Sequence, residues 1–324
     1  MYELHIYQES FDQYLKDKVT SKEPRNLYEP ISYILNLGGK RLRPVLLLLV
    51  ADLFSGKYKN ALDAALAVEV FHNFSLVHDD IMDAAPLRRG EATVHEKWDV
   101  NTAILSGDAM LINAYRLFEN YPDAVFKELA TLFSTTAIQV CEGQQYDIDF
   151  ATMEDVSIAQ YIHMIEYKTA VLVGASLQMG AIIAESSVEC KTAIYEFGKL
   201  LGTAFQIQDD YLDVFGDPID FGKQVGGDII ENKKTYLYLK ALEQADEKNK
   251  QQLLHLYSIN PVDAKGKIDT VKSLFLQSKA DEATKNAIQE YTEKAFSVLE
   301  KMDLSEAKKE PLRRFGENLM NRQY

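Results

Sequence analysis

Two stretches of the chain each end an apolar, helix-compatible run with three acids at positions i, i+1 and i+4. The first triplet is Asp79, Asp80 and Asp83, and the second is Asp209, Asp210 and Asp213. At 100° per residue, residues i and i+4 lie one above the other on a single helix face, with residue i+1 beside them. Each run therefore predicts a long, largely buried helix that carries carboxylates at the edge of its buried face.

Carboxylates this close raise one another's pKa unless a cation lies between them. A single triplet could be a solvated helix end, whereas two in the same apolar context suggest the facing walls of one metal site. Ligands that are all carboxylate oxygens suit Mg²⁺ or Mn²⁺ rather than zinc. Because Mg²⁺ keeps waters and takes further oxygens from substrate phosphates, the two triplets predict a magnesium site for a phosphorylated ligand.

The rest of the chain favours helices throughout. No useful strand alternation and no Asn-Gly or Asp-Gly hairpin signal occurs, and the prolines fall between helices or near their starts, with Pro24 and Pro30 separating the first two. The expected helices are 4–19, 28–37, 45–54, 61–85, 101–121, 123–150, 157–184 and 188–215, followed by amphipathic helices from 236 to 324. We predict an all-α fold: one domain, residues 1–324, forming a large helical bundle around a central apolar cavity.

The formal charge of the 324-residue chain is -14, from 49 acids and 35 bases. This balance argues against nucleic acid as a partner. A phosphate ligand therefore needs bases that are placed locally, and the sequence has three such groups in predicted loops. They are Lys40, Arg41 and Arg43 after Gly38-Gly39; Arg88 and Arg89 after the first acid triplet; and Lys223, Lys233 and Lys234 after the second.

The two cysteines, Cys141 and Cys190, form neither a zinc motif nor a disulfide framework, which predicts a reducing cytoplasm. The first ten residues include acids and have no apolar core of a signal peptide. The longest uncharged stretch, 169–184, is too short and too mixed to span a membrane.

Acid helices that bind Mg²⁺, separate basic loops and an apolar interior together fit a ligand with an anionic head and a hydrocarbon tail. The simplest such molecule is a diphosphate ester of a hydrocarbon. Basic groups in separate loops suggest two diphosphates, only one of them bound to metal.

At this point the sequence resembles the trans-isoprenyl diphosphate synthases, or polyprenyl synthetases, of the short-chain geranylgeranyl/farnesyl diphosphate synthase type. The motifs that carry the resemblance run in family order: Gly-Gly-Lys-Arg-Leu-Arg-Pro, Asp-Asp-Ile-Met-Asp with Arg-Arg-Gly, Tyr-Lys-Thr-Ala, and Gln-Ile-Gln-Asp-Asp-Tyr-Leu-Asp with Gly-Lys-Gln. The resemblance implies an isoprenoid synthase fold, a homodimer, three Mg²⁺ ions (with Mn²⁺ as a substitute) and two substrates, isopentenyl diphosphate and an allylic diphosphate (dimethylallyl, geranyl or farnesyl).

The resemblance also implies roles for single residues. The metal ligands would be Asp79, Asp83 and Asp209, supported by Asp80 and Asp213. The allylic diphosphate would be held by Arg88, Lys168, Thr169, Gln206, Lys223 and Lys233, of which Lys168, Thr169 and Gln206 are the expected catalytic residues. Isopentenyl diphosphate would be held by Lys40, Arg43, His72 and Arg89. Gln144 and Asp147, which look like surface residues from spacing alone, would line the cavity wall.

Product length is expected to depend on the helix that precedes Asp79. Phe74 lies five residues before Asp79, about 7.5 Å along the helix axis, and Phe71 lies eight before it, about 12 Å. In the family, a bulky fifth residue resembles short-chain synthases, and C15 synthases often add an aromatic at the fourth position, where this chain has Ser75. We therefore expect the C20 product, geranylgeranyl diphosphate, with C15 farnesyl diphosphate as the alternative.

Three other readings stay open. A class I terpene cyclase would share the fold and the first acid motif but would have no use for the basic loop at 38–44. A metal phosphohydrolase, suggested by His78-Asp79, would need more histidine ligands than six histidines readily supply. A non-catalytic subunit of a partner synthase would not need intact acid triplets. One departure from the family is the C-terminus, where only Arg322 could supply the basic tail that closes over the isopentenyl site in some members.

Overall fold

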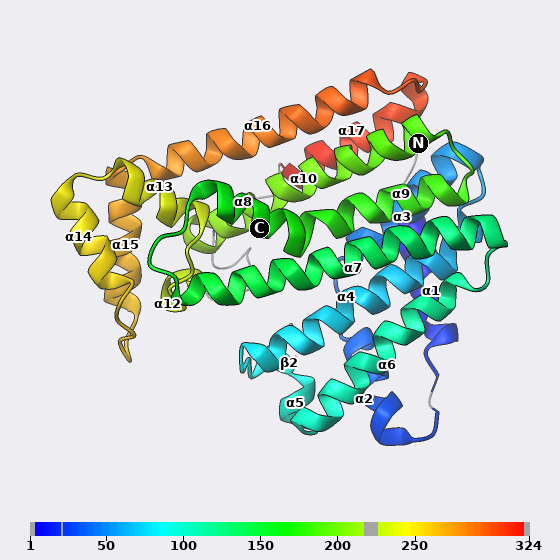
Figure 1. Cartoon of the computed structure of the whole chain (residues 1–324), viewed down its shortest axis with the longest axis horizontal. Helices are drawn as coiled ribbons and strands as arrows, with labels where there is room; N and C mark the ends of the chain where they lie inside the picture. The colour runs from blue at the N-terminus through cyan, green and yellow to red at the C-terminus, as the bar shows by residue number, and fades with distance from the viewer. Residues whose placement is uncertain (1–3, 21, 217–225, 321–324) are drawn as a thin grey trace. The chain divides into compact units, whose positions relative to one another are not determined.

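The computed structural model describes residues 4–20, 22–216 and 226–320, and helices dominate it (Figure 1). The predicted all-α class is confirmed. The chain divides into two compact units, each assembled from separated segments: unit 1 comprises Met1–Thr135 and Ala175–Thr192, and unit 2 comprises Thr136–Gly174 and Ala193–Tyr324. The prediction that residues 1–324 form one domain stays a prediction.

Unit 1 is made mainly of helices joined by short loops. Its elements are α1 Leu4–Lys18, α2 Arg25–Asn36, α3 Leu42–Ser55, η1 Tyr58–Ala61, α4 Leu62–Met82, β1 Leu87–Arg88, β2 Glu91–Ala92, α5 Val94–Lys97 and α6 Val100–Phe118. Helix α3 is buried along nearly its whole length, since Val45 to Ala51 are all buried. Helix α4 packs against both α3 and α6, which explains why its sequence is apolar on more than one face.

Unit 2 contains α8 and η2, which precede the second acid triplet, and the helices that follow it. Its elements are α8 Ile158–Ile165, the π-helical turn η2 Glu166–Ala170, α12 Gly227–Ile230, α13 Tyr236–Gln244, α14 Glu247–Leu256, α15 Lys265–Gln277, α16 Ala280–Lys301 and α17 Glu306–Met320. One buried cluster joins α8, α10, α13 and α15, and includes Tyr161, Ile207, Leu237 and Phe275. The amphipathic pattern expected after residue 236 is therefore used to build this core.

Three long helices contribute residues to both units: α7 Asp123–Thr152, α9 Val171–Ile183 and α10 Val188–Phe215. Helix α10 ends where the sequence predicted, at Phe215. No described helix combines the length and the apolar character that crossing a membrane requires.

The structure corrects three expectations. Pro30 does not separate helices but lies inside α2, which begins at Arg25 directly after Pro24. The expected single helix 157–184 is interrupted by the π-helical turn η2, which contains Lys168 and Thr169. The loop after the first triplet contains a small antiparallel pairing of β1 with β2, in which Arg88 lies opposite Glu91.

Candidate active site

In unit 1, arginines gather around His72. The Arg43 and His72 side chains are 3.3 Å apart, and the Arg89 guanidinium donates to the Gly38 carbonyl oxygen. Burial, together with the positive charges of Arg43 and Arg89, lowers the pKa of His72 well below its usual value, so the imidazole is neutral at pH 7. Among the described residues, none accepts a hydrogen bond from the buried Arg43 Nε. The cluster is therefore suited to an anion.

The backbone of the preceding loop is shaped to fit this cluster. Gly39 has a φ of +130°, and a methyl group at this position would lie 3.1 Å from the Arg89 guanidinium carbon. Glycine alone accommodates both constraints without strain. Arg89, Arg43 and His72, all predicted to hold isopentenyl diphosphate, thus lie in one unit. Lys40, the fourth predicted residue, is exposed on the same loop.

Arg41 does not join its neighbours in that cluster. Its side chain is buried, pairs with the buried Glu69 carboxylate and donates to the Leu35 carbonyl oxygen at 2.6 Å. The sequence grouping of Lys40, Arg41 and Arg43 as one cationic loop is therefore wrong for Arg41. A positive φ of 49° at Arg41, the residue before α3, turns this side chain inward, where it ties the loop to α4.

The first acid triplet ends α4. Asp80 is fully buried, and its Oδ1 accepts hydrogen bonds from the Arg88 Nε, at 3.0 Å, and from a terminal nitrogen of the same guanidinium. Burial raises the pKa of Asp80, and the hydrogen bond from Arg88 opposes that rise. Asp79 is half-buried and Asp83 is exposed. Arg88, predicted to hold the allylic diphosphate, thus neutralises the central acid of this triplet.

The predicted chain-length residues lie on α4 before this triplet. The Phe71 and Phe74 rings are buried, with centroids 5.6 Å apart. Phe71 also packs edge-on against Phe133 at 5.0 Å, and Phe74 packs against the His78 ring at 4.7 Å. The Ser75 hydroxyl donates to the His72 carbonyl oxygen at 2.8 Å, so it is occupied by its own helix. The two aromatic rings form one continuous packed surface.

In unit 2, a pocket that is open to solvent brings together four of the predicted site residues. The predicted residues are Lys168, Thr169, Gln206 and Lys233, and the other lining residues are Asp147, Tyr161, Met164, Ile165, Asp210, Asp228, Lys234 and Thr235. The Lys168 ammonium donates to Asp147 Oδ2 at 2.5 Å. Gln144 is buried, so its interpretation as a surface residue from spacing alone is wrong.

A chain of hydrogen bonds runs along one side of this pocket. Thr169 Oγ1 donates to Gln206 Oε1 at 3.1 Å, and Gln206 Nε2 donates to Asp210 Oδ1 at 2.9 Å. The Tyr161 hydroxyl donates to the other carboxylate oxygen of Asp210 at 2.5 Å. Burial, and next the negative charge of Asp228, raise the pKa of Asp210 well above its usual value.

The second acid triplet also anchors the short helix α12. The backbone N–H of Gly226 donates to the Asp213 carbonyl oxygen at 2.7 Å, and that of Asp228 donates to Asp213 Oδ2 at 3.0 Å. Burial, and then the charge of Asp213, raise the pKa of Asp228 to about 7. The Lys233 ammonium lies 2.7 Å from Glu231 and 3.6 Å from Asp228. In unit 2, the lysines of the pocket therefore lie next to acids: Lys233 beside Glu231 and Asp228, and Lys168 beside Asp147.

The residues present fit a divalent cation of the magnesium type. Among the described residues, none donates to the buried Asp80 Oδ2, which leaves a carboxylate oxygen in need of a positive partner. Within residues 4–20, 22–216 and 226–320, no three His, Cys, Asp or Glu side chains form a preassembled metal cage. Mg²⁺ does not need one, because it is commonly held by one or two carboxylates, waters and substrate phosphates.

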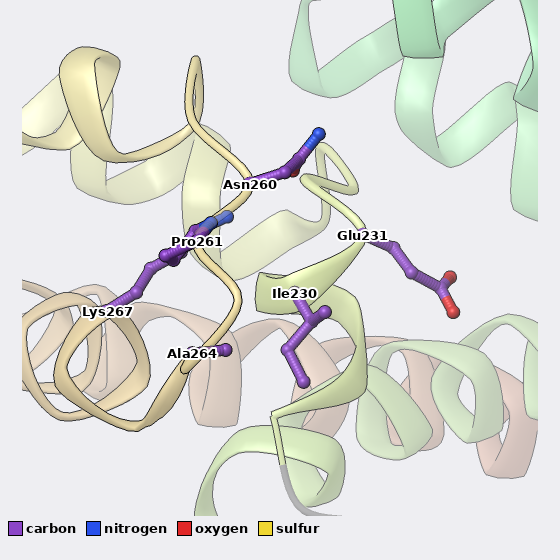
Figure 2. Close-up of a pocket in the computed structure, with 6 residues that line it drawn as sticks. All are labelled: Ile230, Glu231, Asn260, Pro261, Ala264 and Lys267. Atoms are coloured by element: carbon purple, nitrogen blue, oxygen red, sulfur yellow. The ribbon is translucent and has the colours of Figure 1, made fainter.

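A second pocket in unit 2 is lined by Ile230, Glu231, Asn260, Pro261, Ala264 and Lys267 (Figure 2). It lies between the end of α12 and the start of α15, and the Glu231 carboxylate points away from Lys267. The buried Lys267 ammonium already donates to Asn232 Oδ1 at 2.5 Å and to the Ile259 carbonyl oxygen at 3.0 Å. This lysine therefore ties the 259–267 segment to the end of α12.

Sequence reasoning missed Tyr161 and Asp228, and it placed Asp210 in the second acid triplet without giving it a role of its own. Tyr161 lies in an ordinary amphipathic helix, where a tyrosine is a common core residue, and only its contact with Asp210 distinguishes it. Asp228 follows Gly226 and Gly227, a pattern that predicts a loop. In the structure these residues instead begin the short helix α12, with Gly226 as its N-cap. Lys223, predicted to bind the allylic diphosphate, lies outside the described residues.

The chain is similar to known proteins over most of its length. Residues 24–275 match the model of the polyprenyl synthetase family. A short chain isoprenyl diphosphate synthase of Methanothermobacter thermautotrophicus is 38% identical over 254 residues, 78% of each chain. A geranylgeranyl pyrophosphate synthase of Geoglobus acetivorans is 35% identical over 303 residues, 93% of this chain and 91% of that protein.

Solved structures extend the likeness to the whole chain. A crystal structure of a geranylgeranyl pyrophosphate synthase has a TM-score of 0.96 and 52% identity, and the match covers 100% of both chains. A crystal structure of the geranylgeranyl pyrophosphate synthetase from Pyrococcus horikoshii Ot3 has a TM-score of 0.90 and 33% identity, and the match covers 98% of this chain and 97% of that one. The expected isoprenoid synthase fold is thereby confirmed, and the chain belongs to the polyprenyl synthetase family.

Proposed function

We propose that this chain is a short-chain prenyltransferase of the geranylgeranyl diphosphate synthase type, which joins isopentenyl diphosphate to an allylic diphosphate. The observation that carries the proposal is the unit 2 pocket, which gathers Lys168 and Lys233 for an anionic head and Thr169 and Gln206 beside them. Cations and neutral dipoles in one partly enclosed pocket suit an ester whose bond to an anionic leaving group must break.

The chemistry follows from the charges. The allylic C–O bond breaks, its electron pair leaves with the diphosphate, and an allylic cation remains. The terminal carbon of the isopentenyl double bond attacks that cation, which forms the new C–C bond and leaves a tertiary cation on the isopentenyl unit. The CH₂ group next to that cation, on the side away from the new bond, then loses a proton to the departing diphosphate, which is adjacent and basic, and a new double bond forms. Lys168 and Lys233 stabilise the leaving group by donating hydrogen bonds to its oxygens. Exclusion of water protects the cation from being quenched.

The second substrate would bind in unit 1. Arg43, Arg89 and His72 form a cluster that is mostly cationic, and the exposed Lys40 lies on the same loop. Guanidinium groups suit a diphosphate because they bind its oxygens in pairs. The neutral His72 adds a donor or acceptor without adding charge. A terpene cyclase, which has no second substrate, would have no use for this cluster.

The acids would hold three Mg²⁺ ions, with Asp79, Asp83 and Asp209 as principal ligands and Asp80 and Asp213 in support. When bound, these ions would neutralise the charge that develops on the leaving diphosphate. Support comes from the polyprenyl synthase of Caulobacter crescentus CB15, which was solved with calcium and isoprenyl diphosphate; it is 25% identical with a TM-score of 0.88, over 99% of this chain and 96% of that one.

The proposed product is C20 geranylgeranyl diphosphate, with C15 farnesyl diphosphate as the alternative. The packed Phe74 and Phe71 rings are the proposed floor of the channel for the growing chain. Named relatives at similar identity support a product of this size or larger: the Methanosarcina mazei protein is a geranylgeranyl diphosphate synthase, 41% identical over 224 residues, 68% of this chain and 69% of that one. The Natronomonas pharaonis relative, 38% identical over 254 residues, 73% of this chain and 74% of that one, is a geranylfarnesyl diphosphate synthase.

We also propose a homodimer in the cytoplasm. Four large apolar side chains of α6, namely Val100, Ile104, Leu105 and Ile112, are 40% to 60% exposed. Apolar side chains grouped on one exposed helix are typical of a protein interface. Light scattering behind size-exclusion chromatography would give twice the chain mass if a second copy covers α6.

The experiment that tests the function is chromatography of the dephosphorylated product made by the purified chain from dimethylallyl, geranyl or farnesyl diphosphate with isopentenyl diphosphate and Mg²⁺. A C20 alcohol is expected, and EDTA should abolish its formation until Mg²⁺ is restored. A cyclic hydrocarbon released from the allylic substrate alone would establish a cyclase instead. Activity that needs an added partner protein would establish a non-catalytic subunit.

A further inference from the structure

We propose that Tyr161 is a positioning residue that acts through Asp210 and Gln206 to fix the Thr169 hydroxyl as a hydrogen-bond acceptor facing the allylic carbon. The inference rests on the proposed prenyl transfer and deepens it. It gives a role to the buried Tyr161, which the reaction does not otherwise use, and a further role to Asp210 of the second acid triplet.

The four residues form one continuous chain of contacts within unit 2. Tyr161 is 1% exposed and Asp210 is 8% exposed, so their contact is shielded from water. Asp210 receives one donor on each carboxylate oxygen, Tyr161 on Oδ2 and Gln206 on Oδ1. All four side chains line the same pocket as Lys168 and Lys233.

The direction of each hydrogen bond follows from what each group can donate. Asp210 accepts from both neighbours, so the Gln206 amide presents its NH₂ group to Asp210 and its carbonyl oxygen to Thr169. Thr169 has a single hydroxyl proton, and it is donated to that carbonyl oxygen. What Thr169 can offer a bound ligand is therefore an oxygen lone pair and not a proton.

This changes the role expected for Thr169. A hydroxyl that only accepts cannot hold a phosphate oxygen by donating to it, but it places partial negative charge beside any positive charge that develops in the pocket. The neighbouring lysines can serve the diphosphate. Thr169 would then face the carbon that becomes cationic, and the bond from Tyr161 would keep Asp210, and through it the Gln206 amide, in the orientation that this requires.

The test is a double-mutant cycle with Tyr161→Phe and Thr169→Val, measured as kcat and both KM values. Each single substitution should lower kcat about tenfold and leave both KM values nearly unchanged. A tenfold loss corresponds to about one hydrogen bond to a charged group or to a charge that develops in the transition state. Because both act through the same oxygen, the double variant should also lose about tenfold rather than about a hundredfold. Thr169→Ser, which keeps the hydroxyl, should retain kcat.

Tyr236→Phe is the matched control, because it removes the hydroxyl of another buried tyrosine, whose ring centroid lies 6.2 Å from that of Tyr161. It should leave kcat unchanged, and an equal loss in this control would overturn the proposal. Multiplicative losses in the double variant would also overturn it, as would a Tyr161→Phe enzyme with normal kcat. If Tyr161→Phe does not fold, the cycle is run with Asp210→Asn and judged by the same non-additivity. Failure of the wild-type chain to form any prenyl product would instead disprove the proposed function.

Discussion

The two acid triplets have the same spacing but differ in what holds their central acid. In unit 1, Asp80 is paired with the Arg88 guanidinium, which follows it by eight residues and reaches back from β1. In unit 2, Asp210 is held by the neutral donors Tyr161 and Gln206. The spacing places the carboxylates on the helix, but the neighbouring element decides whether the central charge is neutralised.

Because of this difference, the surroundings of the two triplets suit different functions. Unit 1 pairs its central acid with Arg88 and places Arg43 and Arg89 around His72. Unit 2 keeps Asp210 beside Asp228 and places lysines around them. The first arrangement suits a fixed anion site, and the second suits a pocket in which charge changes during the reaction.

The largest effect on stability is expected where the central acid depends on a cation. Arg88→Ala removes the ion-pair partner of Asp80, which is fully buried, and should destabilise the fold by about 3 kcal/mol. Tyr161→Phe leaves Asp210 bonded to Gln206 and should cost about 1 kcal/mol. Urea unfolding of both variants measures the difference, and equal costs would contradict the comparison. Adding Asp80→Asn to Arg88→Ala should recover part of the loss.

A smaller effect, on substrate affinity, should separate the two units. Lys40→Ala and Arg43→Ala should raise the KM for isopentenyl diphosphate roughly tenfold or more, because each would remove a charge-assisted contact to that substrate. Lys168→Ala should chiefly impair use of the allylic diphosphate. Initial rates with each substrate varied in turn give both constants. If all three variants affect both substrates alike, the assignment of one diphosphate to each unit is wrong.

Substitution of Phe74 is expected to have the smallest effect on the rate, but it should change the length of the product. Phe74→Ala should remove part of the floor of the proposed channel and so lengthen the product. Because the two rings pack together, adding Phe71→Ala should deepen the channel and lengthen the product further. Ser75→Phe should shorten the product. Chromatography of the dephosphorylated alcohols measures this, and the product ratio does not depend on how much enzyme is folded. An unchanged ratio in Phe74→Ala would mean that the growing chain takes another route.

Helix positions followed well from the sequence, since long apolar runs bounded by glycine, proline and loops leave few alternatives. Helix α10 matches its expected bounds, and α4 ends three residues earlier than expected, at Met82. The interruption at η2 was not foreseen, because the residues from Glu166 to Ala170 carry no helix-breaking signal.

Site residue types were predictable, but side-chain directions were not. Arg41 and Arg43 are alike in sequence, yet a positive φ at Arg41 sends it into the core while Arg43 reaches His72. Arg88 was expected on a substrate and is bound to Asp80. Pairing of this kind depends on a turn that brings residues together in space, and spacing along one helix cannot reveal it.

The central claim is that both acid triplets serve a single metal-dependent reaction. The most direct test is the kcat of Asp79→Ala and of Asp209→Ala at saturating Mg²⁺ and substrates, with Glu189→Ala, an exposed acid on α10, as the control. Each of the two site variants should lose at least about a hundredfold in kcat while keeping the helical circular dichroism of the wild type, and the control should keep its activity. Near-normal turnover in either Asp79→Ala or Asp209→Ala would contradict the account.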